Sequence, residues 1–216
     1  MNRQQYFSDV ADHLSSSDLA YVQRAYWLVK EAHRRQSRRL TGERFFEHVR
    51  RVSYAVGITY GYADAHHFAL GLLHDIVEDT FTPQDIIVNL FGHVMYHDIL
   101  VLSKELPAFD SVSGRMIKRA KLSDDEYYPA LAAAGPKPRR VKGCDRIDNV
   151  ADLAQWEPTR RIYGVVKSCV TNAKEMLFSL KRRPSQLVED TAALAYHLVT
   201  ECMVILASPD RRRFLA

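Results

Sequence analysis

Apolar positions recur every three to four residues along most of the chain, and the strict alternation typical of strands is scarce. The first apolar stripe predicts an amphipathic helix that Ser17 or Asp18 would cap. Its apolar members are Leu19, Val22, Ala25, Tyr26, Val29 and Ala32. A second helix should begin near Phe45 and break around Gly57. Residues 64–79 are apolar nearly all round, which predicts a central, buried helix.

The middle of the chain gives weaker signals. Thr82 and Pro83 have the form of an N-cap and a first-turn proline, and they predict a helix over residues 84–91. A further helix should cover residues 94–102. Residues 105–121 show no clear period, and we expect a loop with a short helix there.

The pattern becomes helical again towards the C-terminus. Ser123 and Glu126 form the Ser-x-x-Glu pattern of a capping box. Pro129 comes late for a first turn, so a start of this helix at Tyr128 stays open as the alternative. Two long helices are then expected, over residues 159–180 and 185–207. The whole pattern predicts an all-α fold, a helical core with additional N- and C-terminal helices.

Composition is that of a globular protein with a packed core. The chain has 216 residues, of which 47% are hydrophobic and 26% are charged. We expect a single domain over residues 1–216, with the motif-bearing core at about 18–156 and a helical extension at about 159–208. No apolar run reaches the about 18–20 residues of a membrane span, and the N-terminus lacks the apolar stretch of a signal peptide. These features predict a cytoplasmic protein without a membrane partner.

Cysteine content and net charge are also those of a cytosolic protein, here one with a small anionic ligand. Three cysteines fit no Cys-x-x-Cys pattern and cannot all pair, which favours a reducing cytosol. The formal net charge of +4 suits an anionic small molecule. Basic clusters at residues 181–183 and 211–213 lack interleaved aromatic residues, so no nucleic-acid partner is expected. The role of these clusters and the oligomeric state stay open.

The most informative motif runs from His74 to Asp79, at the end of the central apolar segment. In one continuous helix His74, Asp75, Glu78 and Asp79 would share one side, within about 140° of arc. Burying so much charge is costly unless a cation compensates it, so a divalent metal is expected there. His48 and Asp145 are the candidates for the remaining ligands. Such a mixed nitrogen and oxygen set suits Mn²⁺, Fe²⁺, Zn²⁺ or Mg²⁺.

The segment around Asp145 supports this reading independently. On a helix, Asp145, Asp148, Asn149 and Asp152 lie on one side, whereas the opposite side is apolar. The amide of Asn149 can donate a hydrogen bond to a phosphoryl oxygen, which ionised carboxylates cannot do. Arg38, Arg39 and Lys142, beside these motifs, are candidate partners for an anionic ligand, and a basic solvated loop is the alternative.

The order His, His-Asp, Asp on helical segments is the signature of the HD phosphohydrolase superfamily. The surrounding motifs resemble the hydrolase domain of Rel/Spo-type (p)ppGpp enzymes, in particular the small stand-alone alarmone hydrolases. The resemblance covers roughly residues 20–155. The matching motifs are Ala32–Arg39 followed by Thr41–His48, then Leu73–Thr80, Phe91-Gly92 with Leu102–Lys104, and Lys142–Asn149.

The resemblance implies a role for each of these residues. It implies one metal ion, Mn²⁺ by family preference, held by His48, His74, Asp75 and Asp145. Glu78 would take a proton from water, and Asp79 would orient that water or protonate the leaving group. The implied substrate contacts are Arg38, Arg39, Thr41, Phe45, Lys142, Asn149 and Asp152. From their positions in the pattern, His33 should be a supporting or core residue, and His66 and His67 should be partly exposed or packing residues.

The implied reaction removes the 3′-pyrophosphate from (p)ppGpp, the alarmone of the stringent response, and leaves GDP or GTP. Several positions depart from the family pattern on the substrate side. One extra residue precedes Gly42, Phe45 replaces Tyr, and Asp148 and Asp152 replace His and Thr. Two alternatives therefore stay open: hydrolysis of another nucleotide, such as NADPH or a deoxynucleotide, and a non-catalytic module that senses nucleotides. The intact pair Glu78-Asp79 argues against the second.

Overall fold

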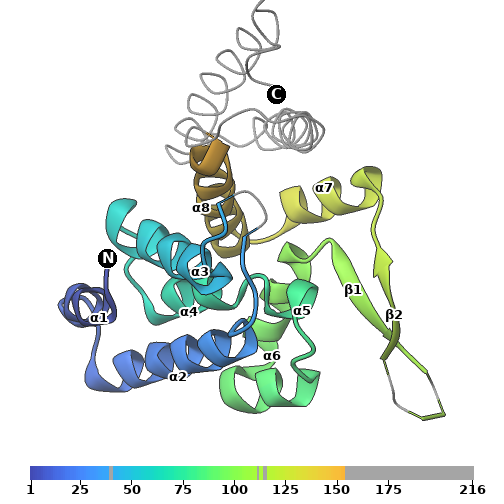
Figure 1. Cartoon of the computed structure of the whole chain (residues 1–216), viewed down its shortest axis with the longest axis horizontal. Helices are drawn as coiled ribbons and strands as arrows, with labels where there is room; N and C mark the ends of the chain where they lie inside the picture. The colour runs from blue at the N-terminus through green and yellow to red at the C-terminus, as the bar shows by residue number, and fades with distance from the viewer. Residues whose placement is uncertain (39–40, 111, 114–115, 154–216) are drawn as a thin grey trace, which may run out of the picture. The chain divides into compact units, whose positions relative to one another are not determined.

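The computed structural model describes residues 1–38, 41–110, 112–113 and 116–153 (Figure 1). The helices expected over residues 159–180 and 185–207 lie outside these residues. The chain divides into two compact units. The first contains Met1–Gln36 and Arg44–Lys142, and the second contains Ser37–Glu43 and the chain from Gly143 onward. The expected single domain with its core and extension stays a prediction.

The first unit begins with α1 (Arg3–Ala11) and α2 (Ser16–Ala32). Ser15 caps α2, because its hydroxyl accepts the main-chain N–H of Asp18 at 3.2 Å. The cap therefore lies before the predicted Ser17 or Asp18. The predicted apolar stripe is confirmed, since its central members are buried: Val22, Ala25, Tyr26 and Val29.

The next helix, α3 (Phe45–Tyr54), begins where the sequence predicts and continues into the π-helical turn η1 (Ala55–Thr59). Gly57, the predicted break, lies in this turn. A Cβ atom at Gly57 would lie 2.0 Å from the ring of Phe68. The missing side chain therefore makes room for Phe68 to pack against the turn.

The predicted single helix over residues 64–79 is wrong. The structure has α4 (Ala65–Leu73) and a short α5 (Ile76–Asp79), separated by His74 and Asp75. Asp75 has φ −101° and ψ 0°, which ends the regular path of α4. The buried position is as predicted, since α4 packs against both α2 and α3 (Figure 1).

The following helix, α6 (Gln84–Leu102), consists of two segments, as predicted. Gly92 interrupts it with φ 84° and ψ 166°, values open to glycine but strained for other residues. Pro83 occupies the N-cap position and not the first turn, so the predicted cap at Thr82 is wrong. Within the described part of the chain, α6 is the one helix long and apolar enough to pass a length-and-composition test for a membrane span.

Residues 105–121 form a β-hairpin, which corrects the prediction of a loop with a short helix. Strands β1 (Glu105–Phe109) and β2 (Met116–Lys121) pair antiparallel, and β1 runs beside α5 (Figure 1). Pro107 lacks a main-chain donor, but a two-stranded ribbon consists of edge strands, which tolerate proline.

The capping box of Ser123 and Glu126 is confirmed at the start of α7 (Asp124–Ala133). The alternative start at Tyr128 is wrong, and Pro129 lies inside the helix. The last described helix, α8 (Pro136–Leu153), has a proline in its first position, where its lack of an N–H costs no hydrogen bond. Over the described ranges the fold is therefore all-α with one hairpin, and α8 begins in the first unit and continues into the second at Gly143.

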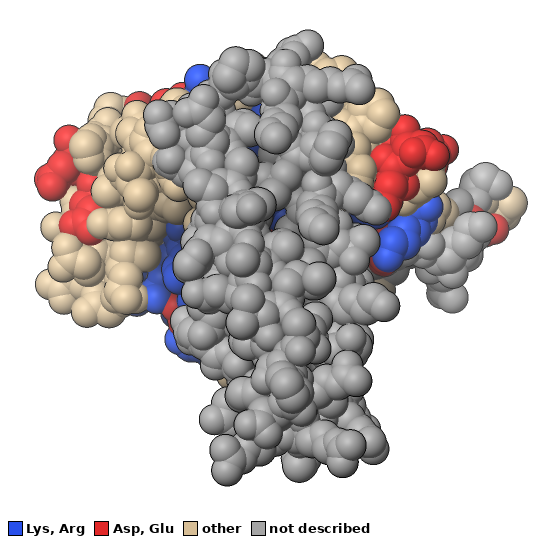
Figure 2. Space-filling model, turned by 90° about the horizontal axis from the view of Figure 1, so that it is seen from above, with Lys and Arg blue, Asp and Glu red and all other residues tan. Residues whose placement is uncertain are grey.

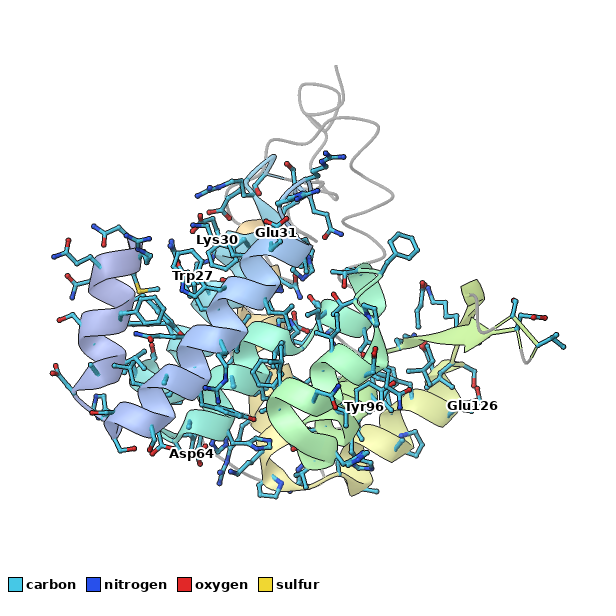
Figure 3. All side chains as sticks on the ribbon, turned by 90° about the horizontal axis from the view of Figure 1, so that it is seen from below. Trp27, Lys30, Glu31, Asp64, Tyr96 and Glu126 are labelled. Carbon is cyan, nitrogen blue, oxygen red and sulfur yellow. The ribbon has the colours of Figure 1, made fainter. Side chains whose placement is uncertain are left out.

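A cluster of ring and charge contacts joins the start of α8 to the start of α4, within the first unit. The guanidinium carbon of Arg140 lies 3.9 Å from the ring centroid of Tyr62, and Tyr62 stacks on His67 at 5.5 Å. Asp64, labelled in Figure 3, lies 3.3 Å from Lys137 Nζ and 2.9 Å from His67 Nδ1. His67 is thus the packing residue that the sequence predicts, and these contacts fix the first turns of α8.

Candidate metal centre

Two buried imidazoles face each other across the contact between α3 and α4. His48 is 1% exposed and His74 is 0% exposed, and their ring centroids are 5.3 Å apart. The two helices approach closely at Gly71, where a Cβ atom would lie 2.6 Å from the Cα of Ser53. The glycine therefore permits the contact that brings the rings together.

The protonation of His74 follows from its hydrogen bond. Its Nδ1 lies 2.8 Å from the main-chain oxygen of Gly71. A carbonyl oxygen only accepts, so Nδ1 carries the hydrogen. In the neutral ring Nε2 then carries no hydrogen and has an available lone pair. This is the tautomer of a histidine that binds a metal through Nε2.

The carboxylate of Asp75 lies against both rings. Its Oδ2 is 3.1 Å from Nε2 of His74 and 3.6 Å from Nε2 of His48. The side chain does not cap α5. A lone pair of His74 that faces a carboxylate oxygen needs a cation between them, either a proton or a metal ion. The donor set therefore fits a divalent metal, and within the first unit the structure brings together the predicted ligands His48, His74 and Asp75.

Glu78 and Asp79, the predicted catalytic pair, have different surroundings. Glu78 is half-buried, and its Oε2 accepts the main-chain N–H of Lys104 at 2.9 Å. Asp79 is exposed, and its main-chain oxygen accepts from the amide of Gln36 at 2.6 Å. The hydrogen bond from Lys104 thus restrains the orientation of Glu78, whereas Asp79 is an exposed residue. Their catalytic roles stay predictions.

His33 supports this cluster. It is buried at the end of α2, where Nδ1 lies 2.7 Å from the amide oxygen of Gln36, and it stacks on Phe45 at 4.7 Å. Burial lowers the pKa of His33; the Asp75 carboxylate raises it, whereas His74 and His48 lower it further. The ring of Phe45 also meets His48 edge-on at 5.5 Å. His33 and Phe45 therefore form an aromatic wall at the imidazoles, a supporting role that the sequence predicts for His33.

The second unit contains Asp145 on α8, which is 3% exposed, and a hydrogen-bonded chain that leads to it. Arg38 Nη2 donates to Oδ1 of Asn149 at 2.7 Å, and Nδ2 of Asn149 donates to Oδ1 of Asp145. The sequence predicts that Asn149 and Asp145 share one side of a helix, which is confirmed. The sequence does not predict the hydrogen bond from Arg38 to Asn149, because no local pattern relates residues so far apart.

The loop that carries Arg38 is closed by its own main chain. Arg38 donates to the oxygen of Glu43 at 2.7 Å, and Gly42 donates to the oxygen of Arg38 at 2.9 Å. Gly42 has φ +70°, the left-handed region that favours glycine. The hydroxyl of Thr41 accepts from the main chain of Glu43 at 3.3 Å. Thr41 is therefore a turn-forming residue, and its predicted substrate contact stays a prediction.

The remaining predicted substrate contacts are placed only in part. Lys142 is 5% exposed, and its Nζ lies 5.9 Å from the ring centroid of Tyr127. Asp152 belongs to α8, and Arg39 lies outside the described residues. The role of each in substrate binding stays a prediction.

Surface charge near the hairpin is paired. Figure 2 shows a group of acidic side chains beside a group of basic ones at the right of this face. Among the pairs of opposite charge at the hairpin and the start of α7, Lys104 pairs with Asp124, and Lys121 Nζ lies 3.4 Å from Oε1 of Glu105.

The described residues form an all-α fold, and His48, His74 and Asp75 form a cluster compatible with metal binding. No family model and no curated protein matches the chain. A solved structure described as a metazoan ortholog of SpoT, which hydrolyzes ppGpp and plays a role in starvation responses, is similar to it. The TM-score is 0.67 at 19% identity, over 82% of this chain and 95% of that chain. This likeness establishes the predicted fold.

Proposed function

We propose that this protein is a metal-dependent hydrolase that removes the 3′-pyrophosphate from (p)ppGpp and leaves GDP or GTP. The observation that carries the proposal is the convergence of Asp75 Oδ2 on Nε2 of His74 and of His48, at 3.1 and 3.6 Å. The fold supports the choice of substrate, since the similar solved structure is described as hydrolysing ppGpp.

Asp145 completes the proposed ligand set. His48, His74 and Asp145 offer two ring nitrogens and one carboxylate oxygen, and Asp75 adds a second carboxylate. Such a mixed set suits hard and borderline divalent ions, and Mn²⁺ is the ion we propose. The sequence order of these four residues supports the assignment, together with the burial of Asp145.

The chemistry is attack of water on the phosphorus joined to the ribose O3′. A divalent cation at the site would lower the pKa of water and neutralise charge on the phosphoryl group. Glu78 accepts the proton of the attacking water, because its carboxylate is oriented by the N–H of Lys104. The bond from O3′ to phosphorus breaks, the O3′ hydroxyl regains a proton, and pyrophosphate leaves. Asp79, at the exposed end of α5, orients the water or supplies that proton.

We propose that the substrate-binding residues come from α3, from α8 and from the loop between α2 and α3. We assign the phosphates and the guanine to the basic residues Arg38, Arg39 and Lys142. Phe45 supplies an apolar wall, since its ring lies against His33 and His48. Asn149 and Thr41 offer polar groups, and Asp152 can accept from a ribose hydroxyl. The ligand is a small nucleotide, and the proposed location is the cytoplasm.

The experiment that tests this function is a product analysis. Purified protein with Mn²⁺ is incubated separately with ppGpp, pppGpp, NADPH and a deoxynucleoside triphosphate, and the products are separated. We expect pyrophosphate with GDP from ppGpp and with GTP from pppGpp. The Asp75→Asn variant, purified and assayed in the same way, should release no pyrophosphate from either alarmone. Rapid hydrolysis of NADPH or the deoxynucleotide with inert ppGpp would overturn the substrate, and binding without turnover of any nucleotide would indicate a sensor.

A further inference from the structure

The hydrogen-bonded chain from Arg38 through Asn149 to Asp145 carries a further inference, which rests on the proposed function for the role of Asp145 as a ligand. We propose that Arg38 and Asn149 are positioning residues that orient the Asp145 carboxylate for the metal. The distance from Arg38 Nη2 to Asn149 Oδ1 is 2.7 Å, and Asn149 Nδ2 donates directly to Asp145 Oδ1.

The two hydrogen bonds can be donated in one direction only, from Arg38 to Asn149 and from Asn149 to Asp145. A guanidinium has donors and no acceptor, and a carboxylate has acceptors and no donor. Asn149 has one of each, so it must turn its oxygen to Arg38 and its nitrogen to Asp145. Both neighbours therefore select the same orientation of the amide. Neither a leucine nor an aspartate at position 149 can connect the two ends in this way.

Helix geometry supplies one half of the arrangement. Asn149 follows Asp145 by four residues on α8, so the two side chains are neighbours on one face. Arg38 comes from a different segment, the loop closed by Gly42 and the Arg38–Glu43 hydrogen bond. The conformation of the loop that contains Arg38 therefore affects the orientation of the buried Asp145 carboxylate. The hydrogen bond from Asn149 fixes the orientation of the Asp145 carboxylate, which a metal ligand requires.

The test is the affinity for Mn²⁺ in the absence of nucleotide, measured by isothermal titration calorimetry on the whole chain. Loss of a partner that orients a ligand weakens metal binding by about 10–100-fold. We expect such a loss for Asn149→Leu and at least about 10-fold for Arg38→Ala. The double variant should bind as weakly as Asn149→Leu alone, because Arg38 acts through Asn149.

Arg34→Ala is the matched control, since Arg34 pairs with Glu31 on the exposed side of α2 and lies four positions from Arg38. Its affinity for Mn²⁺ should equal that of the unaltered protein. Circular dichroism of each metal-free variant verifies folding. Where Asn149→Leu fails to fold, the comparison of Arg38→Ala with Arg38→Lys decides, and lysine should restore part of the affinity.

The outcomes separate this inference from the proposed function. Unchanged Mn²⁺ affinity in Arg38→Ala, with a raised KM, would overturn the positioning role and make Arg38 a substrate contact only. Additive losses in the double variant would overturn the serial arrangement. If the unaltered protein holds Mn²⁺ but cleaves no alarmone, the proposed function fails while the affinities still decide the role of Arg38. If it holds no metal, both fall.

Discussion

The Nδ1–H of His74 donates to the main-chain oxygen of Gly71 at 2.8 Å, one turn earlier in α4. Gly71 is also the position where α3 comes closest, since a Cβ atom there would lie 2.6 Å from the Cα of Ser53. One residue therefore permits the helix contact and orients a candidate ligand. Packing and metal binding should change together when it is altered.

Gly71→Ala should destabilise the protein and weaken metal binding. The Cβ atom would meet main chain, which cannot rotate away, so α3 and α4 must separate. Overpacking of this kind costs about 1–3 kcal/mol in the free energy of unfolding. Urea unfolding and Mn²⁺ titration measure the two effects. The matched control is Gly135→Ala, where a Cβ atom meets nothing within 4 Å. Equal stability of the two variants would contradict the packing argument.

Asp75→Asn should abolish metal binding while the fold remains. The amide has nearly the same shape but no negative charge to balance a cation beside two imidazoles. We expect Mn²⁺ to raise the thermal midpoint of the unaltered protein and to leave that of the variant unchanged. Asp85→Asn, at the exposed start of α6, should respond to Mn²⁺ like the unaltered protein. A full Mn²⁺ response in Asp75→Asn would remove Asp75 from the ligand set.

Glu78→Gln should lower kcat by about 100-fold or more while metal stays bound, the range for loss of a general base. The amide oxygen can still accept the N–H of Lys104, so the side chain keeps its place and loses only its basicity. Steady-state kinetics and metal content of the same preparation test this. An unchanged kcat would mean that another group accepts the proton.

Stability should fall as the pH falls below the ordinary pKa of histidine, in part because of His67. Burial lowers the pKa of His67, which outweighs the opposing effect of Asp64, and Lys137 and Arg140 lower it further. The unfolded chain therefore binds a proton at a pH where the folded protein does not, and the free energy of unfolding decreases there. His67→Phe keeps the stack on Tyr62 but cannot titrate.

Urea unfolding at about pH 7.5 and about pH 5.5 measures this dependence. The loss of stability between the two should be smaller in His67→Phe than in the unaltered protein. An equal loss in both would show that His67 contributes nothing to the pH dependence.

Local patterns in the sequence predict the elements whose causes are local. The apolar stripe of α2, the start of α3 at Phe45 and the capping box of Ser123 and Glu126 depend on neighbours within one or two turns. The break at Asp75 does not, since the apolar run continues through it and periodicity alone predicts one helix. Periodicity does not predict the hairpin either, because Pro107 and the charged residues of β2 hide the alternation of its strands.

The candidate site divides in the same way. His48, His74 and Asp75 are recognisable because their order along the chain is characteristic, and the structure brings them together. The partner of Asn149 is not recognisable, because a side-chain amide can face a phosphate, a guanidinium or a carboxylate with equal chemical sense. Only the folded loop identifies Arg38 as its donor.

The hydrogen bond that orients Glu78 comes from the main chain of Lys104 and not from its side chain. Every amino acid except proline has the same N–H, so substitution at position 104 can alter the pairing with Asp124 and leave this contact in place. Distant homologues could therefore diverge at this position while the orientation of the acid persists. Selection at position 104 should act mainly against proline, a preference that deep mutational scanning would detect.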